Sequence, residues 1–551
     1  MIVVSNNRVD IVRLSILITL LAISYIYWFA SSDDSIFYRL LFQHDLAGAL
    51  GLLFVIAISL IPLRNAIDTR EIALTVARHH KLIAGMVWII LCIGSLSVYQ
   101  NHPLSMDEYA ASFQAHVFAS GNLAGRVPPE LLDWTVPQQF QGHFLVVNKH
   151  SGQIATAYWP GFSLLLTPFV WLGIPWACNP LIVAASVLIT GQLAHEITGE
   201  KSARGWAIML AIASPAFTLN GISYYSMPAH LLFNLVFVWL LLHPSPIRIV
   251  TAGLVGSFAL VLHNPYPHLL FALPWLAWMV FRREGGIRNG LLLALGYIPL
   301  VSLIGIGWVS HLESIRQFGQ AITSSEAPAV QLPWIVRAAI SLTHPFHLPT
   351  ETTLAFRISG LAKLWLWSAP FLIVIAALAC YRLQNRILKM MGASFIITVS
   401  GYFLIPVSQG HGWGDRYSHS AWGVLPILAA AWLCKSSPRE HYSNALLSTT
   451  LKSALLSLIL MTTLRTWQIG AFMESHLTQL PSFPEGQPSI VFIRNGYYAM
   501  DLVQNDPYLR SHPWIFKSRG QQADMELAKR LFPDGYRYSG NKHGWTYTTE
   551  K

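Results

Sequence analysis

The sequence predicts an all-α polytopic membrane protein that ends in a small α/β module. Of its 551 residues, 53% are hydrophobic and only 11% are charged. Apolar stretches of about 17 to 20 residues recur along the chain, and each is long enough to cross a bilayer. Lysine and arginine are concentrated in short segments between these stretches, as is typical of cytoplasmic loops. The formal net charge of +10 therefore reflects membrane topology rather than nucleic-acid binding.

Residues 1–100 are expected to hold three membrane spans, Ile11–Ala30, Leu46–Leu63 and Leu82–Tyr99. The first is long enough to be a retained span rather than a cleaved signal peptide. Basic residues lie between the second and third spans, whereas two aspartates follow the first. Because positively charged loops stay in the cytoplasm, the N-terminus is predicted to be cytoplasmic and the segment after Tyr99 external.

Residues 178–470 are predicted to form the rest of the transmembrane core. All short basic loops fall on the cytoplasmic side only if Gly161–Trp176, an apolar run broken by Pro168 and Pro175, does not cross the membrane. We expect a re-entrant or interfacial half-helix there, about thirteen spans in all and an external C-terminus. The predicted core spans are Pro180–His195, Trp206–Ile222, Pro228–Leu242, Ile249–Leu262, His268–Phe281, Leu291–Val309, Trp365–Tyr381, Met391–Val407, Ala421–Cys434 and Ser453–Trp467.

Three external regions are large enough to hold chemistry. They are residues 101–177, which include the half-helix, the loop 310–363 and the tail 471–551. The tail is expected to fold as a small α/β module. Its predicted elements are strands at Ser489–Ile493 and Trp514–Ser518, a helix at Gln522–Phe532 and a terminal hairpin over residues 535–548.

The sequence Ser105-Met-Asp-Glu108 has the pattern of a capping box. In that motif Ser105 is the N-cap and the Glu108 side chain bonds back to its backbone N–H. Behind it, Tyr109, Phe113 and Val117 recur at four-residue spacing, which predicts an amphipathic helix on the membrane surface with these side chains facing the membrane. Glu108 is therefore either a helix cap or a substrate-binding residue.

Asp107 is the candidate catalytic residue. A helix cap needs only one of the two adjacent carboxylates, so the second is available for chemistry. A carboxylate at the boundary between membrane and water can act as a general base toward a substrate hydroxyl.

Lys149 and Tyr158 are candidate phosphate ligands ahead of the half-helix. Lys149 carries the charge to pair with a phosphate and Tyr158 can donate a hydrogen bond to one. The alternative is an interfacial belt in which the lysine snorkels to the surface and the aromatic rings sit at the headgroups.

His230 and Asn264 lie at the external ends of predicted spans, on the same side as Asp107. Neither these nor the neighbouring histidines show the spacing of a metal site, and we expect polar lining rather than metal ligation. The cysteines, Cys92, Cys178, Cys380 and Cys434, show neither paired-ligand spacing nor a disulfide framework.

The external segment Ser408–Ser420 places three glycines around Asp415 and Arg416. Glycines allow the backbone to approach a ligand closely, and arginine has the geometry that matches a phosphate. Both residues are candidates for substrate binding. The alternative is a purely structural contact, either between the two side chains or between Arg416 and the backbone.

Several of these stretches together resemble the C-superfamily of integral-membrane glycosyltransferases, in the branch of the protein O-mannosyltransferases and the bacterial lipid A aminoarabinose transferases. The resemblance extends from Asp107 to about Trp432. It rests on the acidic pair Asp107-Glu108 followed by "YAASFQAHVFASGNL", on "YWPGFSLLLTP", on "ASPAFTLNGISYYSMPAHLL" and on "GWGDRYSHSAWGVLPILAAAW". The first two predicted spans are an addition to the usual family plan.

The resemblance implies a polyprenyl-phosphate sugar donor, used on the external face without a nucleotide. It also implies that Asp107 takes the proton of an acceptor hydroxyl, while Arg416, with Lys149 or Tyr158, stabilises the departing phosphate. Transfer is expected to invert the anomeric carbon. The expected partners are the donor, a lipid, glycan or protein acceptor, and membrane lipids, with no nucleic acid and no cofactor.

Two other functions are alternatives to this hypothesis. A transporter or flippase predicts charged residues within helices and a repeat between halves, and the sequence shows no such repeat. A non-catalytic envelope-assembly protein predicts that the C-terminal module carries the function. The expected location is the bacterial inner membrane, with the C-terminus extracytoplasmic.

Overall fold

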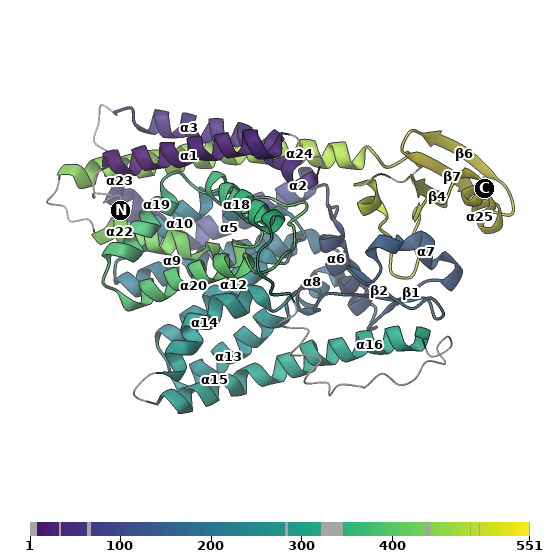
Figure 1. Ribbon diagram of the computed structural model, residues 1–551, viewed down its shortest axis with the longest axis horizontal. Coiled ribbons are helices and arrows are strands. Elements are labelled where there is room, and N and C mark those ends of the chain that lie inside the picture. Colours follow the sequence, from purple (N-terminus) through teal and green to yellow (C-terminus); the bar gives the residue numbers. More distant parts are fainter. Residues whose placement is uncertain are drawn as a thin grey trace.

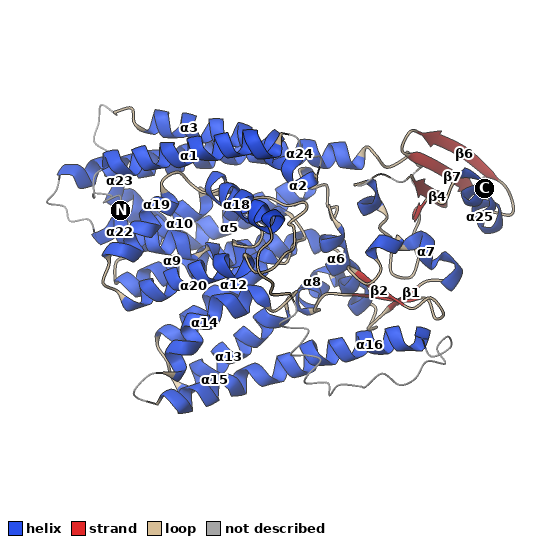
Figure 2. Cartoon of the chain, viewed as in Figure 1, coloured by secondary structure: helices blue, strands red, loops and turns tan. Residues whose placement is uncertain are grey.

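The computed structural model describes residues 8–31, 35–62, 68–281, 285–320, 345–435, 441–484, 486–494, 496 and 498–549. A body of packed helices occupies one end of the molecule, and a smaller part that contains the strands occupies the other (Figure 1). Colouring by secondary structure shows that the strands are confined to that smaller part (Figure 2). The described residues therefore form a helical body and a mixed α/β end.

The helices vary in length from single turns to long rods. They are α1 Arg8–Ala30, α2 Ile36–Leu40, α3 Leu46–Ser59, α4 Thr69–Arg78, α5 His80–Ser97, α6 Met106–Ala119, α7 Leu132–Thr135, α8 Gly161–Trp171, α9 Cys178–Thr198, α10 Lys201–Ile212, α11 Pro215–Leu219, α12 Met227–Leu242, α13 Pro246–Val261, α14 Tyr266–Val280, α15 Gly286–Leu300, α16 Gly307–Gln320, α18 Glu351–Leu366, α19 Leu372–Arg382, α20 Arg386–Tyr402, α21 His419–Trp422, α22 Val424–Lys435, α23 His441–Leu456, α24 Thr462–Leu477 and α25 Gln521–Leu531. The strands are β1 Gly125–Arg126, β2 Leu145–Val147, β3 Gln153–Thr156, β4 Ser489–Ile493, β5 Trp514–Lys517, β6 Tyr536–Asn541 and β7 Gly544–Thr549.

Six helices in the described residues are long and apolar enough to cross a membrane, or seven if one bent pair counts as a span. The first three of them cover the three predicted N-terminal spans. Further apolar helices are shorter than a full span, so the predicted number of about thirteen is not confirmed. The predicted half-helix is α8, whose 11 residues extend only about 16 Å. It is too short to cross a bilayer.

The segment predicted as the span Trp206–Ile222 is bent. It breaks between α10 and α11, and the two parts meet at 73°. Pro215, at the first turn of α11, has no backbone N–H and cannot continue the preceding helix. The freed groups bond to the turn after α18: Ala216 N–H donates to Trp367 O at 3.0 Å, and the Ser214 hydroxyl accepts from the backbone N–H of Ala369.

The predicted C-terminal module is confirmed in all its elements. Its sheet has the strand order β5-β4-β7-β6, in which β4 and β5 are parallel and the other pairs antiparallel. Strand β4 is central, and all five of its side chains are buried, as its unbroken apolar run requires. Helix α24 leads from the helical body to this module (Figure 1).

The region between the body and the module differs from the prediction. The expected loop 310–363 begins as helix, because α16 continues to Gln320; residues 321–344 lie outside the described part. The side chains of Trp308, Leu312 and Ile315 pack against the small antiparallel sheet β1-β3-β2. The apolar stripe of α16 is thus covered by protein. The helix extends to Gln320, beyond the end of the predicted span Leu291–Val309.

A buried ion cluster ties the N-terminal helices to the core. Asp45, between α2 and α3, accepts from Lys363 of α18 at 2.6 Å and from Arg465 of α24 at 2.9 Å. Trp367 also donates its indole N–H to Asp45. Both oxygens of this carboxylate are therefore bonded, and all three charges lie almost entirely out of solvent.

We expect Asp45→Asn to lower the free energy of unfolding by roughly 3–5 kcal/mol, because it leaves two buried cations without a counter-charge. Thermal unfolding in detergent measures this as a large fall in Tm. Glu71→Gln is the matched control, since Glu71 forms an exposed ion pair with Arg78 at 3.8 Å. Equal stability of the two variants would contradict the expected contribution of the cluster to the free energy of unfolding.

Candidate functional site

The predicted capping box at the start of α6 is wrong. Ser105 occupies the N-cap position, but its side chain accepts no bond from the helix and instead contacts the Tyr225 hydroxyl at 3.1 Å. The free helix N–H of Met106 donates to the Asp501 carboxylate at 3.0 Å. The helix is therefore capped from the C-terminal module, 395 residues away in the sequence.

Glu108 points away from the start of its own helix into the protein interior. Its carboxylate accepts from the backbone N–H groups of Leu104 at 2.7 Å and Tyr224 at 2.8 Å, and from the Tyr99 hydroxyl at 3.0 Å. Burial raises the pKa of Glu108 to about 7, although these donors oppose the shift. The side chain is fully buried and joins α6 to the segments after α5 and before α12.

The predicted membrane-facing stripe of α6 is also wrong. Tyr109, Phe113 and Val117 belong to a hydrophobic cluster with the C-terminal sheet. The Tyr109 hydroxyl donates to the backbone O of Asn505 at 2.7 Å. The apolar side chains that suggested a lipid surface are covered by the module, whose contacts sequence periodicity does not reveal.

Asp107 makes two bonds that hold its carboxylate in place. Tyr158 donates its hydroxyl proton to Oδ1, and Arg416 Nη2 donates to Oδ2 at 2.9 Å. Burial acts to raise the pKa of Asp107, but Arg416, His263 and the Tyr158 bond outweigh it and hold that pKa below its usual value. The carboxylate is therefore ionised at neutral pH, and 23% of the side chain stays exposed.

Arg416 is held by its backbone surroundings as well as by Asp107. Its Nη1 donates to the carbonyl oxygens of Gln409 at 2.9 Å and His411 at 3.2 Å, and its guanidinium lies 4.1 Å from the centre of the Tyr225 ring. Gly412 has φ +136°, and a Cβ there would lie 2.5 Å from the Arg416 side chain. Glycine at this turn thus makes room for the arginine.

Asp415 does not pair with Arg416. Its carboxylate accepts from the backbone N–H of Ser418 at 2.9 Å, next to the start of α21. Of the two predicted structural alternatives for this segment, only the contact between Arg416 and the backbone is present.

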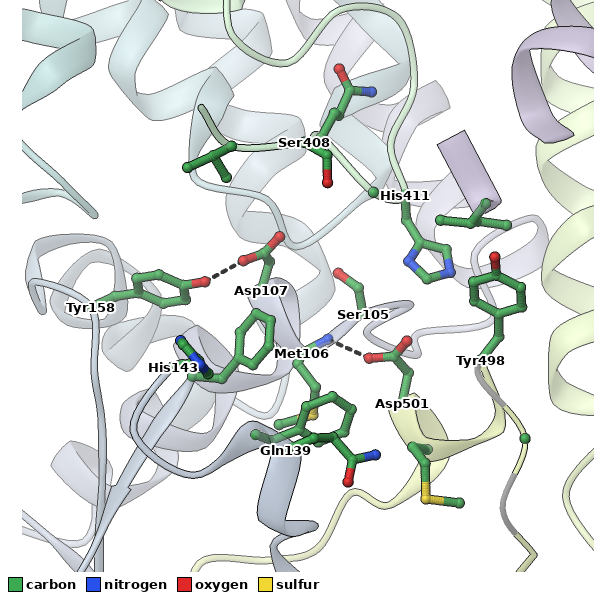
Figure 3. Close-up of a pocket in the computed structure, with 18 residues that line it drawn as sticks. Ser105, Met106, Asp107, Gln139, His143, Tyr158, Ser408, His411, Tyr498 and Asp501 are labelled. Carbon is green, nitrogen blue, oxygen red and sulfur yellow. Dashed lines mark hydrogen bonds between the residues drawn. The ribbon is translucent and has the colours of Figure 1, made fainter. Parts of the chain in front are cut away.

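A cavity of about 910 Å³ opens beside Asp107. Its walls come from the start of α6, the loop before β2, the segment after α20 and the C-terminal module (Figure 3). The lining residues are Ile36, Ser105, Met106, Asp107, Gln139, Phe140, His143, Phe144, Tyr158, Val407, Ser408, Gln409, Gly410, His411, Gly496, Tyr498, Met500 and Asp501. The structure thus places Asp107 and Tyr158 in the wall of a large cavity, with Arg416 bonded to Asp107 behind that wall.

The other predicted binding residues do not line this cavity. Lys149 pairs with Asp133 at 3.1 Å, and more than half of its side chain is exposed. His230 is buried in α12, and its ring nitrogens make no hydrogen bond to the described residues. Asn264 accepts from the backbone N–H of Tyr266 at 3.3 Å, where α14 begins.

Sequence reasoning missed Asp501, Tyr225 and Gln409. Tyr225 lies in the stretch "SYYSMPAHLL" and Gln409 just before the glycine turn. Both therefore lie in or next to segments that the sequence already marks as candidate sites. Asp501 has no such signal, because it lies in a separate module. Within the described ranges, no group of three or more His, Cys, Asp or Glu residues is placed to hold a metal ion.

The fold of the chain is similar to that of a protein of known structure. The chain aligns with the crystal structure of ArnT from Cupriavidus metallidurans bound to undecaprenyl phosphate, with a TM-score of 0.54 and 12% identity, over 85% of this chain and 97% of that one. The apo state of that protein covers the same shares with a TM-score of 0.48. No protein-family model and no curated protein sequence matches. The predicted resemblance to the C-superfamily glycosyltransferases is thereby confirmed at the level of the fold.

Glu108 predicts a pH dependence of stability. Its pKa is raised from 4.5 to about 7 in the folded state, so the folded protein holds a proton that the unfolded chain releases. The free energy of unfolding should fall as pH rises from about 4.5 to about 7, with roughly 3 kcal/mol of that fall due to Glu108. Denaturation in detergent at stepped pH should show a smaller fall for Glu108→Gln, and identical slopes would contradict the assignment.

Proposed function

We propose that this protein is a membrane glycosyltransferase that moves a sugar from a polyprenyl-phosphate donor to an acceptor hydroxyl. One observation carries the proposal: an ionised aspartate, Asp107, is paired with Arg416 at the wall of a large cavity. The pair supplies the two groups that the reaction needs, a base for the hydroxyl and a cation for the phosphate. The fold shared with ArnT, which was crystallised with undecaprenyl phosphate, supports a donor of that chemical class.

The ion pair suggests how donor binding activates the base. The donor phosphate competes with Asp107 for Arg416, whose side chain is 13% exposed. When Nη2 turns to the phosphate, Asp107 loses its main stabilising cation and its pKa rises, which makes it a better proton acceptor. Tyr158 keeps the carboxylate oriented through its bond to Oδ1.

Transfer then proceeds by direct displacement. The acceptor hydroxyl oxygen attacks the anomeric carbon, Asp107 takes the hydroxyl proton, and polyprenyl phosphate leaves on Arg416 with inversion at the carbon. The sugar, a hexose or a pentose, comes from the lipid donor, so the reaction uses no nucleotide, and we expect no cofactor. The acceptor is a lipid, a glycan or a protein.

We propose that this chemistry takes place on the extracytoplasmic side. The N-terminus is cytoplasmic, and the cavity and the C-terminal module face the outside of a bacterial inner membrane. Positive loops between the apolar helices support this orientation.

Asp107→Asn should lower transfer about 100- to 10,000-fold, because the amide keeps the shape of the side chain but cannot take the proton. The assay follows polyprenyl phosphate release from a panel of polyprenyl-phosphate hexoses and pentoses in proteoliposomes. Asp68→Asn is the matched control, since Asp68 only caps α4 and asparagine caps equally well. Undiminished turnover by Asp107→Asn would refute the assignment of Asp107 as the general base.

Arg416→Gln should raise the donor KM at least tenfold, because the phosphate loses its cation. The same variant removes the partner of Asp107, so its Asp107 carboxyl should titrate at higher pH than in the wild type. Donor titrations in proteoliposomes measure the first effect, and pH–rate profiles measure the second. A donor KM equal to that of the wild type would contradict the assigned role of Arg416.

A further inference from the structure

The cavity has a charge pattern that bears on the acceptor. Among the lining residues that the structure describes are two carboxylates, Asp107 and Asp501, and neither lysine nor arginine. Arg416 bonds the lining residue Asp107 at 2.9 Å, and Lys517, which is exposed, contacts the lining residue Gln139 at 3.4 Å. Arg416, which bonds Asp107, is taken by the donor phosphate in the proposed reaction, so a phosphorylated acceptor would face the carboxylates of the wall without a free cation, which disfavours it.

The neutral part of the lining suits a sugar. Aromatic rings of Phe140, Phe144 and Tyr498 offer flat apolar surface, and amide and imidazole side chains from Gln139 and His143 offer hydrogen bonds. A saccharide combines apolar C–H faces with hydroxyl groups that both donate and accept. A lipid chain would leave the polar groups of the wall unpaired.

Asp501 is fixed so that one oxygen remains free for a ligand. Its Oδ1 accepts the Met106 N–H at 3.0 Å, and no described residue bonds its Oδ2. Figure 3 shows Asp501 beside Met106, with His411 and Tyr498 on its side of the cavity and Asp107 and Tyr158 on the other. The same bond that caps α6 therefore holds a second carboxylate close to the proposed base.

We propose that the acceptor is a neutral saccharide bound in this cavity, and that Asp501 accepts a hydrogen bond from its hydroxyl groups. The inference rests on the glycosyltransferase function proposed above. In the transfer step the saccharide oxygen forms a bond to the anomeric carbon, and the bond from that carbon to the phosphate oxygen breaks with its electron pair on polyprenyl phosphate. The hydroxyl proton passes to Asp107 and then to water.

If Asp501 binds the acceptor, its ionisation should make saccharide binding depend on pH. A purely structural role of Asp501 would not produce this dependence. Burial, with the nearby Asp107 charge, raises its pKa to about 7, although the Met106 N–H opposes the shift. Only the ionised carboxylate has both oxygens as acceptors. Saccharide binding should strengthen as pH rises through about 7. The other titratable side chains in the wall are Asp107 and Tyr158 opposite, and His143, His411 and Tyr498.

The test uses the full chain in proteoliposomes with a panel of undecaprenyl-phosphate sugars and three acceptors: neutral oligosaccharides, the same oligosaccharides carrying a phosphate, and serine- and threonine-containing peptides. We expect transfer to the neutral oligosaccharides. Asp501→Asn should raise their KM at least tenfold with little change in donor KM, and should remove the dependence of acceptor KM on pH near 7.

Asp506→Asn is the matched control. Asp506 lies five residues away in the same module, outside the cavity lining, and accepts backbone N–H groups of Tyr508 and Arg510 in a turn that asparagine also forms. Its acceptor KM should match the wild type. The midpoint of thermal unfolding shows whether Asp501→Asn remains folded, and Asp501→Glu, which keeps the charge, should recover part of the lost affinity.

Specific outcomes would overturn the inference. Preference for the phosphorylated oligosaccharides or for the peptides would exclude a neutral saccharide acceptor. An unchanged acceptor KM in folded Asp501→Asn would exclude the role of Asp501. In both cases the donor is still consumed, so the glycosyltransferase function stands. Failure to bind undecaprenyl phosphate and to release it from every donor would instead overturn both.

Discussion

The ion pair between Asp107 and Arg416 is the interaction on which the arrangement of the site depends. Its partners lie 309 residues apart in the sequence, one at the start of α6 and the other in the glycine turn before α21. Two mostly buried opposite charges at 2.9 Å are stable only if both backbones are held in place. The carbonyl groups of Gln409 and His411 hold the arginine, and Glu108 and Asp501 hold the helix that carries Asp107.

The fold could be predicted where hydropathy alone decides it. The N-terminal spans and the strands of the terminal module have strong local patterns, and the structure contains them at nearly the predicted bounds. The break at Pro215 and the extension of α16 were not predicted. Pro215 is itself a local signal for the break, whereas the extension of α16 depends on the distant β2–β3 surface, which a local pattern does not contain.

The site could be predicted in part for the same reason. Asp107, Tyr158 and Arg416 were chosen by residue type and membrane side, and the structure brings them together. The capping box failed because Glu108 finds stronger buried donors on other segments, and Lys149 finds Asp133 instead of the cavity. The role of Asp501 could not be predicted from the sequence because it arises only from the contact between the terminal module and α6. Long-range contacts, not residue chemistry, limited the prediction.

The buried cluster around Asp45 connects the N-terminal helices to the segment that carries the C-terminal module. Arg465 lies in α24, whose last residue, Leu477, is only twelve residues or about 18 Å further along the rod. Beyond that end comes the module that carries Asp501. Through its ion pair with Arg465, Asp45 thus fixes α24, the helix that leads to the module, to the helical body. The position of Asp501 relative to Asp107 is therefore linked, through α24, to a charge cluster that lies outside the cavity lining.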